Sequence, residues 1–401
     1  MARILFVWEQ GANIGHLNNL RLPIEIAVKD GHQVILAARE LHAVKSIIGD
    51  LPITCMQAPF KQNAVILGQE AFLSYTHVLS RQCFSNADEL QVYLNAWCAL
   101  FYLVKPDLVV FEHSPTALIA AHDYRFKKIL VGNGFSIPPQ GQSPDAPFMA
   151  FPTTQLTPAA LETLHSDDVA LLKMINTVLT LIGAKPMGSL HRIYGQAHAR
   201  LLTTWPQLDH FGERPGQLYL GVKPPPPLAP AEWPSGSGPK VFGYLNAMPS
   251  LELFLQGLQN AQTCALLLVR NLPKPLRDRY GSDRIRFIDN AVNLDDVARQ
   301  VSWVVNNCNH NTVAFFAQRG VPQLLIPTYQ EHLFLALRLV QKGAAAMAYQ
   351  DQPAYAAAIN AMLSHAPLRQ QAKLLASQMA PYEKMDAEKH IRKTFEKTLA
   401  A

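Results

Sequence analysis

The chain has 401 residues, 49% of them hydrophobic and 16% charged, a composition that predicts a well-packed globular protein and excludes a disordered one. This length accommodates two domains of ordinary size. The net charge of +5 is spread along the chain without a run of Lys and Arg, so a nucleic-acid partner is not expected.

The five cysteines are odd in number and form no CxxC pair, which favours reduced thiols and a cytoplasmic location. The apolar part of the N-terminal segment MARILFVWEQ is too short for a signal peptide, and we expect a first strand there. No apolar stretch reaches the ~18 residues of a membrane-spanning helix. Peripheral contact with a membrane remains open, although nothing in the chain points to it.

Strands and helices alternate from the first residues onward. We expect strands at Ile4–Trp8, Gln33–Ala37 and Pro52–Met56, with a turn over Gly11–His16 and a helix over Leu17–Lys29. A strand–helix–strand order of this kind predicts a doubly wound parallel sheet.

The alternation continues to residue 222, and we place the first domain at 1–222. Residues 61–103 are expected to be mostly helical, and a Pro-rich loop follows Gly132 up to about Pro152. The remaining elements predicted in this half are strands at Leu108–Phe111, Lys128–Val131, Arg200–Thr204 and Leu218–Leu220, and helices at Thr116–Tyr124 and 157–182.

A Pro-rich stretch at 223–239 is the clearest boundary, because four consecutive prolines followed by Gly-Ser-Gly exclude a helix or a central strand. We place a second domain at 240–380 and a terminal helical segment at 381–401. The strands predicted there are Lys240–Leu245, Ala265–Val269, Ile285–Ile288, Val301–Val305 and Gln323–Ile326. The predicted helices are Pro249–Gln259, Leu294–Arg299, one starting at Val313, Pro353–Met379 ending before Pro381, and Glu383–Leu399.

The turn Asn306–Thr312 lies between an apolar strand and a helix. Backbone N–H groups and a helix N-terminus at the carboxyl end of a strand suit a phosphate. An ordinary turn stabilised by Asn side chains is the alternative. No carboxylate cluster resembles a metal site, so no metal is expected.

Several dipeptides and short motifs match one known pattern. They are Gly15-His16, Gly31-His32-Gln33-Val34, Thr312, Gly320-Val321-Pro322, Pro327 and Ala336. In these residues and their spacing the chain resembles the two-domain (GT-B) UDP-glycosyltransferase family of nucleotide-sugar-dependent enzymes, bacterial type. Asn307 and Asn309 depart from the usual His and Gly, and Glu331-His332 stands where the family has Asp-Gln.

The resemblance implies two Rossmann-like α/β domains facing a cleft, with the terminal helix packing back on the first domain. The expected activity is inverting, metal-independent transfer of a sugar from a UDP-sugar or a dTDP-sugar to a hydroxyl of a small or lipid-like acceptor. The Pro-rich loop after Gly132 would belong to the acceptor site. No cofactor is expected besides the nucleotide-sugar co-substrate.

The catalytic pair implied by the resemblance is His16 as general base and Glu112 as the carboxylate that braces it. Two alternatives stay open: His16 only stabilises a turn, or His113 rather than Glu112 points inward. Glu331 and His332 would bind the donor sugar, unless they form a solvated helix start. The diphosphate is assigned to Asn307, Asn309, His310, Asn311 and Thr312, and the nucleotide to Asn246, Asn290 and Val292.

Two other functions remain compatible with the sequence. One is a nucleotide-sugar epimerase of the same fold, which would release a free sugar without any acceptor. The other is a degenerate homologue that binds without catalysis, for which the departures at Asn307, Asn309 and Glu331-His332 are the motive.

Overall fold

The computed structural model describes residues 1–11, 15–62, 72–140, 146–223, 228–350, 354–364, 366–383 and 385–401. Parts of five predicted segments therefore lie outside the described residues: the turn after Gly11, the region 61–103, the Pro-rich loop, the linker and the start of the helix at Pro353. The chain divides into two compact units. Unit 1 comprises Met1–Thr204, Arg214–Gly221 and Asp386–Ala401, and unit 2 comprises Trp205–Glu213 and Val222–Met385.

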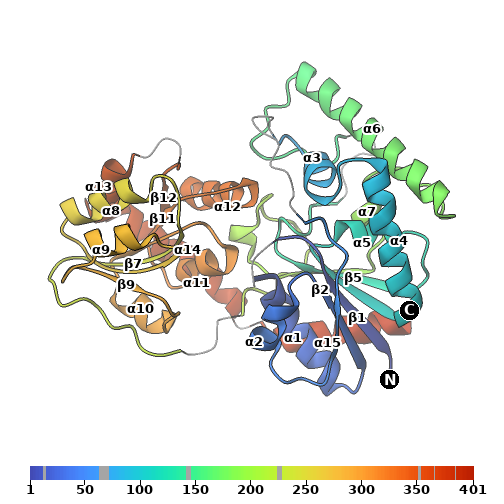
Figure 1. Ribbon diagram of the computed structural model, residues 1–401, viewed down its shortest axis with the longest axis horizontal. Coiled ribbons are helices and arrows are strands. Elements are labelled where there is room, and N and C mark those ends of the chain that lie inside the picture. Colours follow the sequence, from blue (N-terminus) through green and yellow to red (C-terminus); the bar gives the residue numbers. More distant parts are fainter. Residues whose placement is uncertain are drawn as a thin grey trace. The chain divides into compact units, whose positions relative to one another are not determined.

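Unit 1 is built on a sheet whose described strands run in the order β3-β2-β1-β4-β5-β6, all parallel (Figure 1). The strands are β1 (Arg3–Trp8), β2 (Gln33–Ala38), β3 (Thr54–Gln57), β4 (Leu108–Glu112), β5 (Lys127–Gly132) and β6 (Ala199–Leu202). Strands β1 and β4 are almost wholly buried, as expected for central strands covered on both faces.

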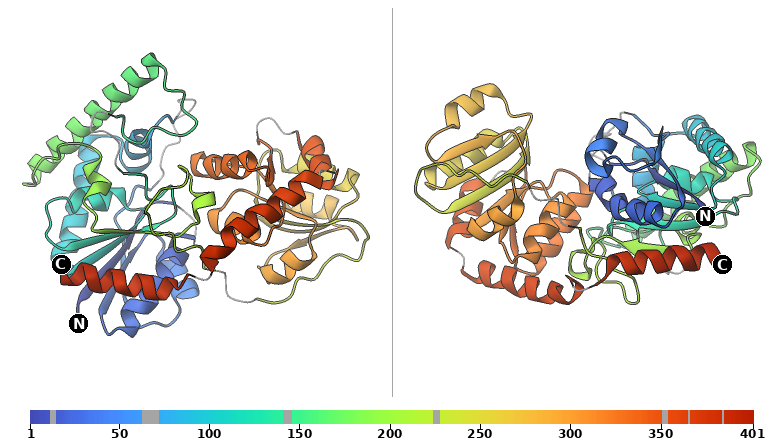
Figure 2. Two further views of the ribbon diagram at one scale, coloured as in Figure 1. Left: turned by 180° about the vertical axis from the view of Figure 1, so that it is seen from behind. Right: turned by 90° about the horizontal axis from the view of Figure 1, so that it is seen from below.

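Helices cover both faces of this sheet. The described helices of unit 1 are α1 (Gly15–Lys29), η1 (Leu41–Ala43), α2 (Val44–Ile48), α3 (Tyr75–Val78), η2 (Leu79–Cys83), α4 (Ala87–Val104), α5 (Pro115–Ala120), α6 (Pro158–Leu181), α7 (Arg192–Gly195) and α15 (Ala387–Ala400). Helices α1 and α15 pack beside each other (Figure 2). Ile391 and Phe395 of α15 join the core formed by Ile4, Phe6 and Leu20. The C-terminal helix is thus an integral part of unit 1.

Unit 2 repeats the architecture, with described strands in the order β12-β11-β10-β7-β8-β9, again all parallel. The strands are β7 (Lys240–Asn246), β8 (Cys264–Arg270), β9 (Ile285–Ile288), β10 (Trp303–Asn306), β11 (Gln323–Leu325) and β12 (Ala345–Met347). Its described helices are η3 (Pro206–Leu208), α8 (Leu251–Asn260), α9 (Lys274–Tyr280), α10 (Leu294–Gln300), α11 (His310–Gln318), α12 (Gln330–Gln341), α13 (Tyr355–Ser364) and α14 (Ala366–Glu383). The predicted α/β class with two Rossmann-like sheets is confirmed.

Side chains of successive strand residues in unit 2 enter opposite cores. Val241 and Leu245 of β7 pack with α8 and α13, whereas Phe242 packs with Phe316 of α11 on the other face. This alternation is the period of two expected of a strand, and it requires helices on both sides of the sheet.

Three predicted elements, a strand and two helices, are corrected by the structure. Leu218–Leu220 forms no strand and makes only an isolated bridge between Tyr219 and Leu202. Helix α11 begins at His310, three residues before the predicted start, because the polar turn already enters the helix. Helix α14 runs through Pro381 and ends at Glu383, so the proline does not end the helix before it but stands two residues from its last residue. Residues 353–379 divide into two helices, α13 and α14.

No helix among the described residues has the length and apolar character needed to cross a membrane.

Glu9, directly after β1, is completely buried and holds the start of α5. Its carboxylate oxygens accept hydrogen bonds from the backbone N–H groups of Thr116 and Ala117, both at 3.0 Å. Burial nevertheless raises the pKa of Glu9 to about 7, because the loss of hydration outweighs these hydrogen bonds. The group therefore titrates near neutral pH inside unit 1.

We predict that Glu9 lowers stability as the pH rises. Its folded-state pKa of about 7 exceeds the ordinary value of 4.5, so between these values the folded chain holds a proton that the unfolded chain has lost. Stability falls through that window by roughly 3 kcal/mol at most. Glu9→Gln should remove this contribution, so that the wild type loses more stability than the variant between about pH 5 and pH 8. Urea unfolding at both pH values measures the difference, and equal losses would contradict the prediction.

Candidate active site

His16 and Glu112 meet at the carboxyl edge of the unit 1 sheet. Strands β1 and β4 are neighbours in register, with Trp8 opposite Glu112, so the helix that follows β1 starts beside the end of β4. The His16 Nδ1 lies 2.9 Å from Glu112 Oε1 and 2.8 Å from Oε2. The structure thus brings together the two residues of the predicted pair, although they are 96 positions apart in the sequence.

The contact assigns the tautomer of His16. Since a carboxylate only accepts hydrogen bonds, Nδ1 carries the proton, and Nε2 is the nitrogen with proton-accepting character. Asn19, one turn further along α1, also donates from Nδ2 to Glu112 Oε1 at 3.1 Å. Sequence reasoning missed Asn19, although its spacing of three from His16 places both on one helix face.

The imidazole of His16 is held on three sides. Trp8 stacks on it with ring centroids 5.6 Å apart, and the ring of His113 packs against it at 5.5 Å. Gly11 closes a third side: a Cβ there would lie 2.0 Å from His16 Nε2. Only a residue without a side chain fits, and Gly11 also has a positive φ of 83°.

His113 lies beside the pair as well, so both residues that were candidates to point inward, Glu112 and His113, do so. Glu112 makes the hydrogen bond to His16, and His113 turns inward next to it, 6% exposed. Burial, followed by the nearby His16 and Arg39, holds the pKa of His113 well below its usual range. Its ring is therefore a neutral imidazole at pH 7.

In unit 2, the turn after β10 is shaped by Asn side chains. Asn306 Oδ1 accepts from the backbone N–H of Cys308 at 2.8 Å, and Asn306 Nδ2 donates to Gln323 Oε1 at 3.0 Å. Gln323 in turn donates to the backbone oxygen of Val313 in α11 at 2.8 Å. These buried bonds fix the turn against the following helix and strand, with Cys308 in the left-handed region.

Asn307 has a structural position. It is fully buried, its Oδ1 accepts from the backbone N–H of Asn246 at 2.7 Å, and its Nδ2 donates to the backbone oxygen of Ile326 at 3.0 Å. The amide thereby joins the ends of β7, β10 and β11. A diphosphate contact from this side chain would require breaking these bonds, so we do not carry it into the proposed function.

The residues after Asn307 form the start of α11. Asn309 is the N-cap residue, and His310, Asn311 and Thr312 make up the first turn. The first backbone N–H groups of any helix lack intrahelical partners and can bind an anion. Asn311 and Thr312 are partly exposed, whereas His310 is buried and stacks on His210 with ring centroids 5.5 Å apart. Burial lowers the pKa of His310 to about 4, so it offers a phosphate no positive charge at pH 7.

The predicted sugar-binding residues occupy the first turn of α12 and differ in exposure. Glu331 is partly exposed. His332 is 2% exposed, lies with Nδ1 2.8 Å from Thr328 Oγ1, and stacks on Tyr329 at 3.8 Å between ring centroids. Burial lowers its pKa to about 3. The role of a sugar-hydroxyl donor therefore does not fit the buried position of His332, while that of Glu331 stays a prediction.

The predicted nucleotide-binding residues follow two strands of the same sheet. Asn246 ends β7 and is exposed, and Asn290, two residues after β9, is also exposed. Val292 is partly buried and packs against the core around Val297 and Phe315. Since the strands are parallel, these residues share the carboxyl edge of the sheet with the turn Asn306–Thr312.

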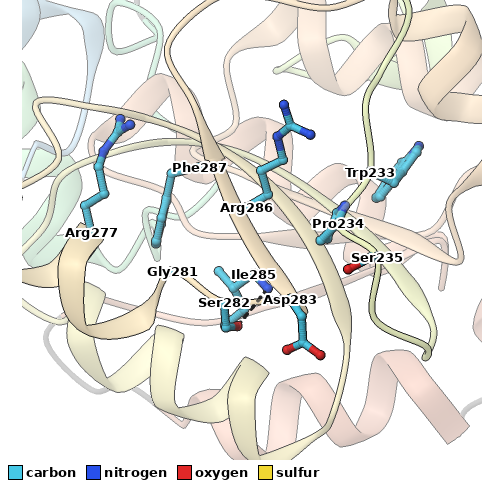
Figure 3. Close-up of a pocket in the computed structure, with 10 residues that line it drawn as sticks. All are labelled: Trp233, Pro234, Ser235, Arg277, Gly281, Ser282, Asp283, Ile285, Arg286 and Phe287. Atoms are coloured by element: carbon cyan, nitrogen blue, oxygen red, sulfur yellow. Dashed lines mark hydrogen bonds between the residues drawn. The ribbon is translucent and has the colours of Figure 1, made fainter.

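A cavity of about 480 Å³ lies elsewhere in unit 2 (Figure 3). It is lined by Trp233, Pro234, Ser235, Arg277, Gly281, Ser282, Asp283, Ile285, Arg286 and Phe287. Its two arginines pair with carboxylates, Arg277 with Asp289 and Arg286 with Glu232. None of the predicted donor-binding residues lines it. Within the described ranges, no group of three or more His, Cys, Asp or Glu side chains could hold a metal ion.

The fold is that of solved glycosyltransferases. The glycosyltransferase VinC, in complex with dTDP, has a TM-score of 0.67 and 15% identity, covering 100% of both chains. The calicheamicin glycosyltransferase CalG4 has a TM-score of 0.68 and 13% identity, covering 100% of this chain and 98% of its own. The spinosyn rhamnosyltransferase SpnG, complexed with spinosyn aglycone, has a TM-score of 0.60 and 14% identity over 98% and 99%.

No family model and no curated protein sequence matches the chain. The resemblance to the GT-B glycosyltransferases is therefore confirmed in the fold, over the whole length of both chains.

We predict that Gly11→Ala displaces the His16 ring. The new Cβ would overlap Nε2, and the ring cannot move without leaving Glu112. Gly31→Ala is the matched control, because Gly31 has a similar φ of 75° but nothing within 4 Å of a Cβ. Nitrogen-15 NMR of the imidazole should show a changed His16 signal in Gly11→Ala and an unchanged one in Gly31→Ala. The same response in both variants would refute the packing argument.

Proposed function

We propose that this chain is an inverting, metal-independent glycosyltransferase that uses a UDP-sugar or a dTDP-sugar and a small-molecule acceptor. The observation that carries the proposal is the buried His16–Glu112 pair at the carboxyl edge of the unit 1 sheet. The GT-B fold supports it over the full chain length. Two similar structures, VinC in complex with dTDP and SpnG complexed with spinosyn aglycone, motivate this choice of donor and acceptor.

In the proposed reaction, the acceptor oxygen attacks the anomeric carbon of the sugar. The hydroxyl proton passes to His16 Nε2 as the new carbon–oxygen bond forms. Glu112 keeps the ring oriented through Nδ1 and stabilises the imidazolium. The bond from the anomeric carbon to the phosphate oxygen breaks, and its electron pair leaves with the nucleoside diphosphate. Attack from the face opposite the leaving group inverts the configuration.

The leaving diphosphate needs hydrogen-bond donors where its charge develops. The backbone N–H groups at the start of α11 and the hydroxyl of Thr312 supply donors, and the helix dipole adds favourable potential. Glu331, at the start of α12, would accept hydrogen bonds from sugar hydroxyls. In this proposal the base belongs to unit 1 and the phosphate-binding residues belong to unit 2.

The first test separates transfer from donor binding in a single variant. His16→Ala should lower the transfer rate by about 10²–10⁴-fold, the usual contribution of a positioned base, and leave nucleotide affinity unchanged. His42→Ala, an exposed histidine of unit 1, is the control and should behave as wild type. Rates are measured by release of UDP or dTDP and affinities by calorimetry. A parallel loss of affinity and rate would reassign His16 to a structural role.

The second test addresses the donor site. Thr312→Val should weaken UDP or dTDP binding about 10-fold, the effect of one hydrogen bond to a charged group. Thr263→Val is the matched control, since Thr263 lies just before the amino end of β8, at the opposite edge of the sheet. Its hydroxyl donates to the backbone oxygen of Leu258 in α8. If wild type shows neither nucleotide binding nor slow hydrolysis of either donor, the transferase assignment fails. Epimerised sugar released without acceptor would instead indicate an epimerase.

A further inference from the structure

Buried polar side chains without hydrogen-bond partners gather at one edge of the unit 1 sheet. His113 follows β4, Ser136 comes four residues after β5, and Thr203 follows β6. In the structure, both ring nitrogens of His113 and the hydroxyls of Ser136 and Thr203 are buried and unpartnered. Strands β4, β5 and β6 are direct neighbours, so the three groups lie along the carboxyl edge that also holds Glu112.

Contacts around Gly132 connect these groups to the catalytic pair. A Cβ on Gly132 would lie 2.9 Å from Ser136 Cβ and 3.4 Å from Glu112 Oε1, so the two residues flank the same glycine. The backbone N–H of Thr203 donates to the Gly132 oxygen at 2.8 Å. The unpartnered groups therefore border the site itself rather than a distant part of the unit.

His113 is the member closest to the proposed chemistry. Its ring packs against His16 at 5.5 Å and edge-on against Phe135 at 6.0 Å between centroids. Its backbone has a φ of 38°, unfavourable for a residue with a side chain, and its oxygen accepts from the N–H of Gln10 at 3.0 Å. A strained backbone and an unpaired buried imidazole both cost stability, and both are typical of functional sites.

Trp8, the other ring that contacts His16, offers no comparable group. Trp8 stacks on the imidazole, but its indole N–H already donates to the Gln10 oxygen at 2.7 Å. Of these two rings that contact His16, His113, a neutral imidazole with one donor and one acceptor, is thus the one with unused hydrogen-bonding capacity. A polar substituent next to the reacting hydroxyl could satisfy it.

We propose that His113 binds a second oxygen of the acceptor, adjacent to the hydroxyl that His16 deprotonates. The acceptor class is then one in which the reacting hydroxyl has a neighbouring oxygen: a vicinal diol, a catechol or a hydroxyketone. This inference rests on the proposed function for its chemistry. His113 is a specificity-determining residue in this view, and Ser136 lines the same edge.

The test compares a catechol acceptor with its phenol analogue on the same scaffold. Wild type should use the catechol with a kcat/KM about 10-fold higher or more, because the phenol leaves His113 unpaired. His113→Phe should abolish this preference, mainly through the KM of the catechol. His113→Asn, which keeps a donor and an acceptor and tolerates a positive φ, should retain part of it. His122→Phe, two residues after the end of α5, is the matched control and should keep the full preference.

Equal use of both acceptors by the wild type would overturn the proposal. So would an equal loss on both acceptors in His113→Phe, which would show a packing role or a water as the partner. A second measurement does not depend on turnover: catechol, but not phenol, should perturb the nitrogen-15 signals of the His113 ring. If transfer is absent but this perturbation occurs, the binding role stands and the proposed function fails. If catechol leaves the ring signals unchanged, the inference is wrong.

Discussion

The hydrogen bond between His16 and Glu112 depends on one constraint, the parallel pairing of β1 with β4. That pairing sets Trp8 beside Glu112, so the first turn of α1 starts within reach of the end of β4. A shift of one residue in this register would turn Glu112 to the other face of the sheet and separate it from the imidazole. The apolar core on both faces, which makes such a shift costly, therefore also determines the geometry of the site.

The two units use polar residues at strand ends in opposite ways. In unit 2, the side chain of Asn306 bonds the backbone of Cys308 and the side chain of Gln323, and that of Asn307 bonds the backbone of Ile326. These polar side chains are therefore used within the turn and its neighbouring strand. In unit 1, His113 and Ser136 are left without partners at the corresponding edge. Asn307, which departs from the family pattern, holds strand ends together through its side-chain amide. Anion binding at this edge would then come from the helix start that follows.

The sequence predicted the central strands well, because runs such as Ile4–Trp8 and Ala265–Val269 are too apolar to lie anywhere but in a core. Short or charged elements were missed: β12 has only three residues, and α9 is rich in Lys and Arg. The resemblance pointed to His16 and Glu112. The supporting contacts of Asn19, Gly11 and His113 depend on which side chains meet in three dimensions, and a single sequence does not contain that information.

The charges of the histidines indicate where protonation can matter. His310 and His332 in unit 2 have pKa values of about 4 and 3 because they are buried, so both remain neutral above about pH 5. These two imidazoles therefore do not change charge between pH 5 and pH 8. Glu9 in unit 1 titrates within that range, and it directly follows β1, the strand that precedes the helix with the proposed base. Of these three buried groups with a shifted pKa, Glu9 is the one that changes charge near neutral pH, because burial outweighs the hydrogen bonds to its carboxylate.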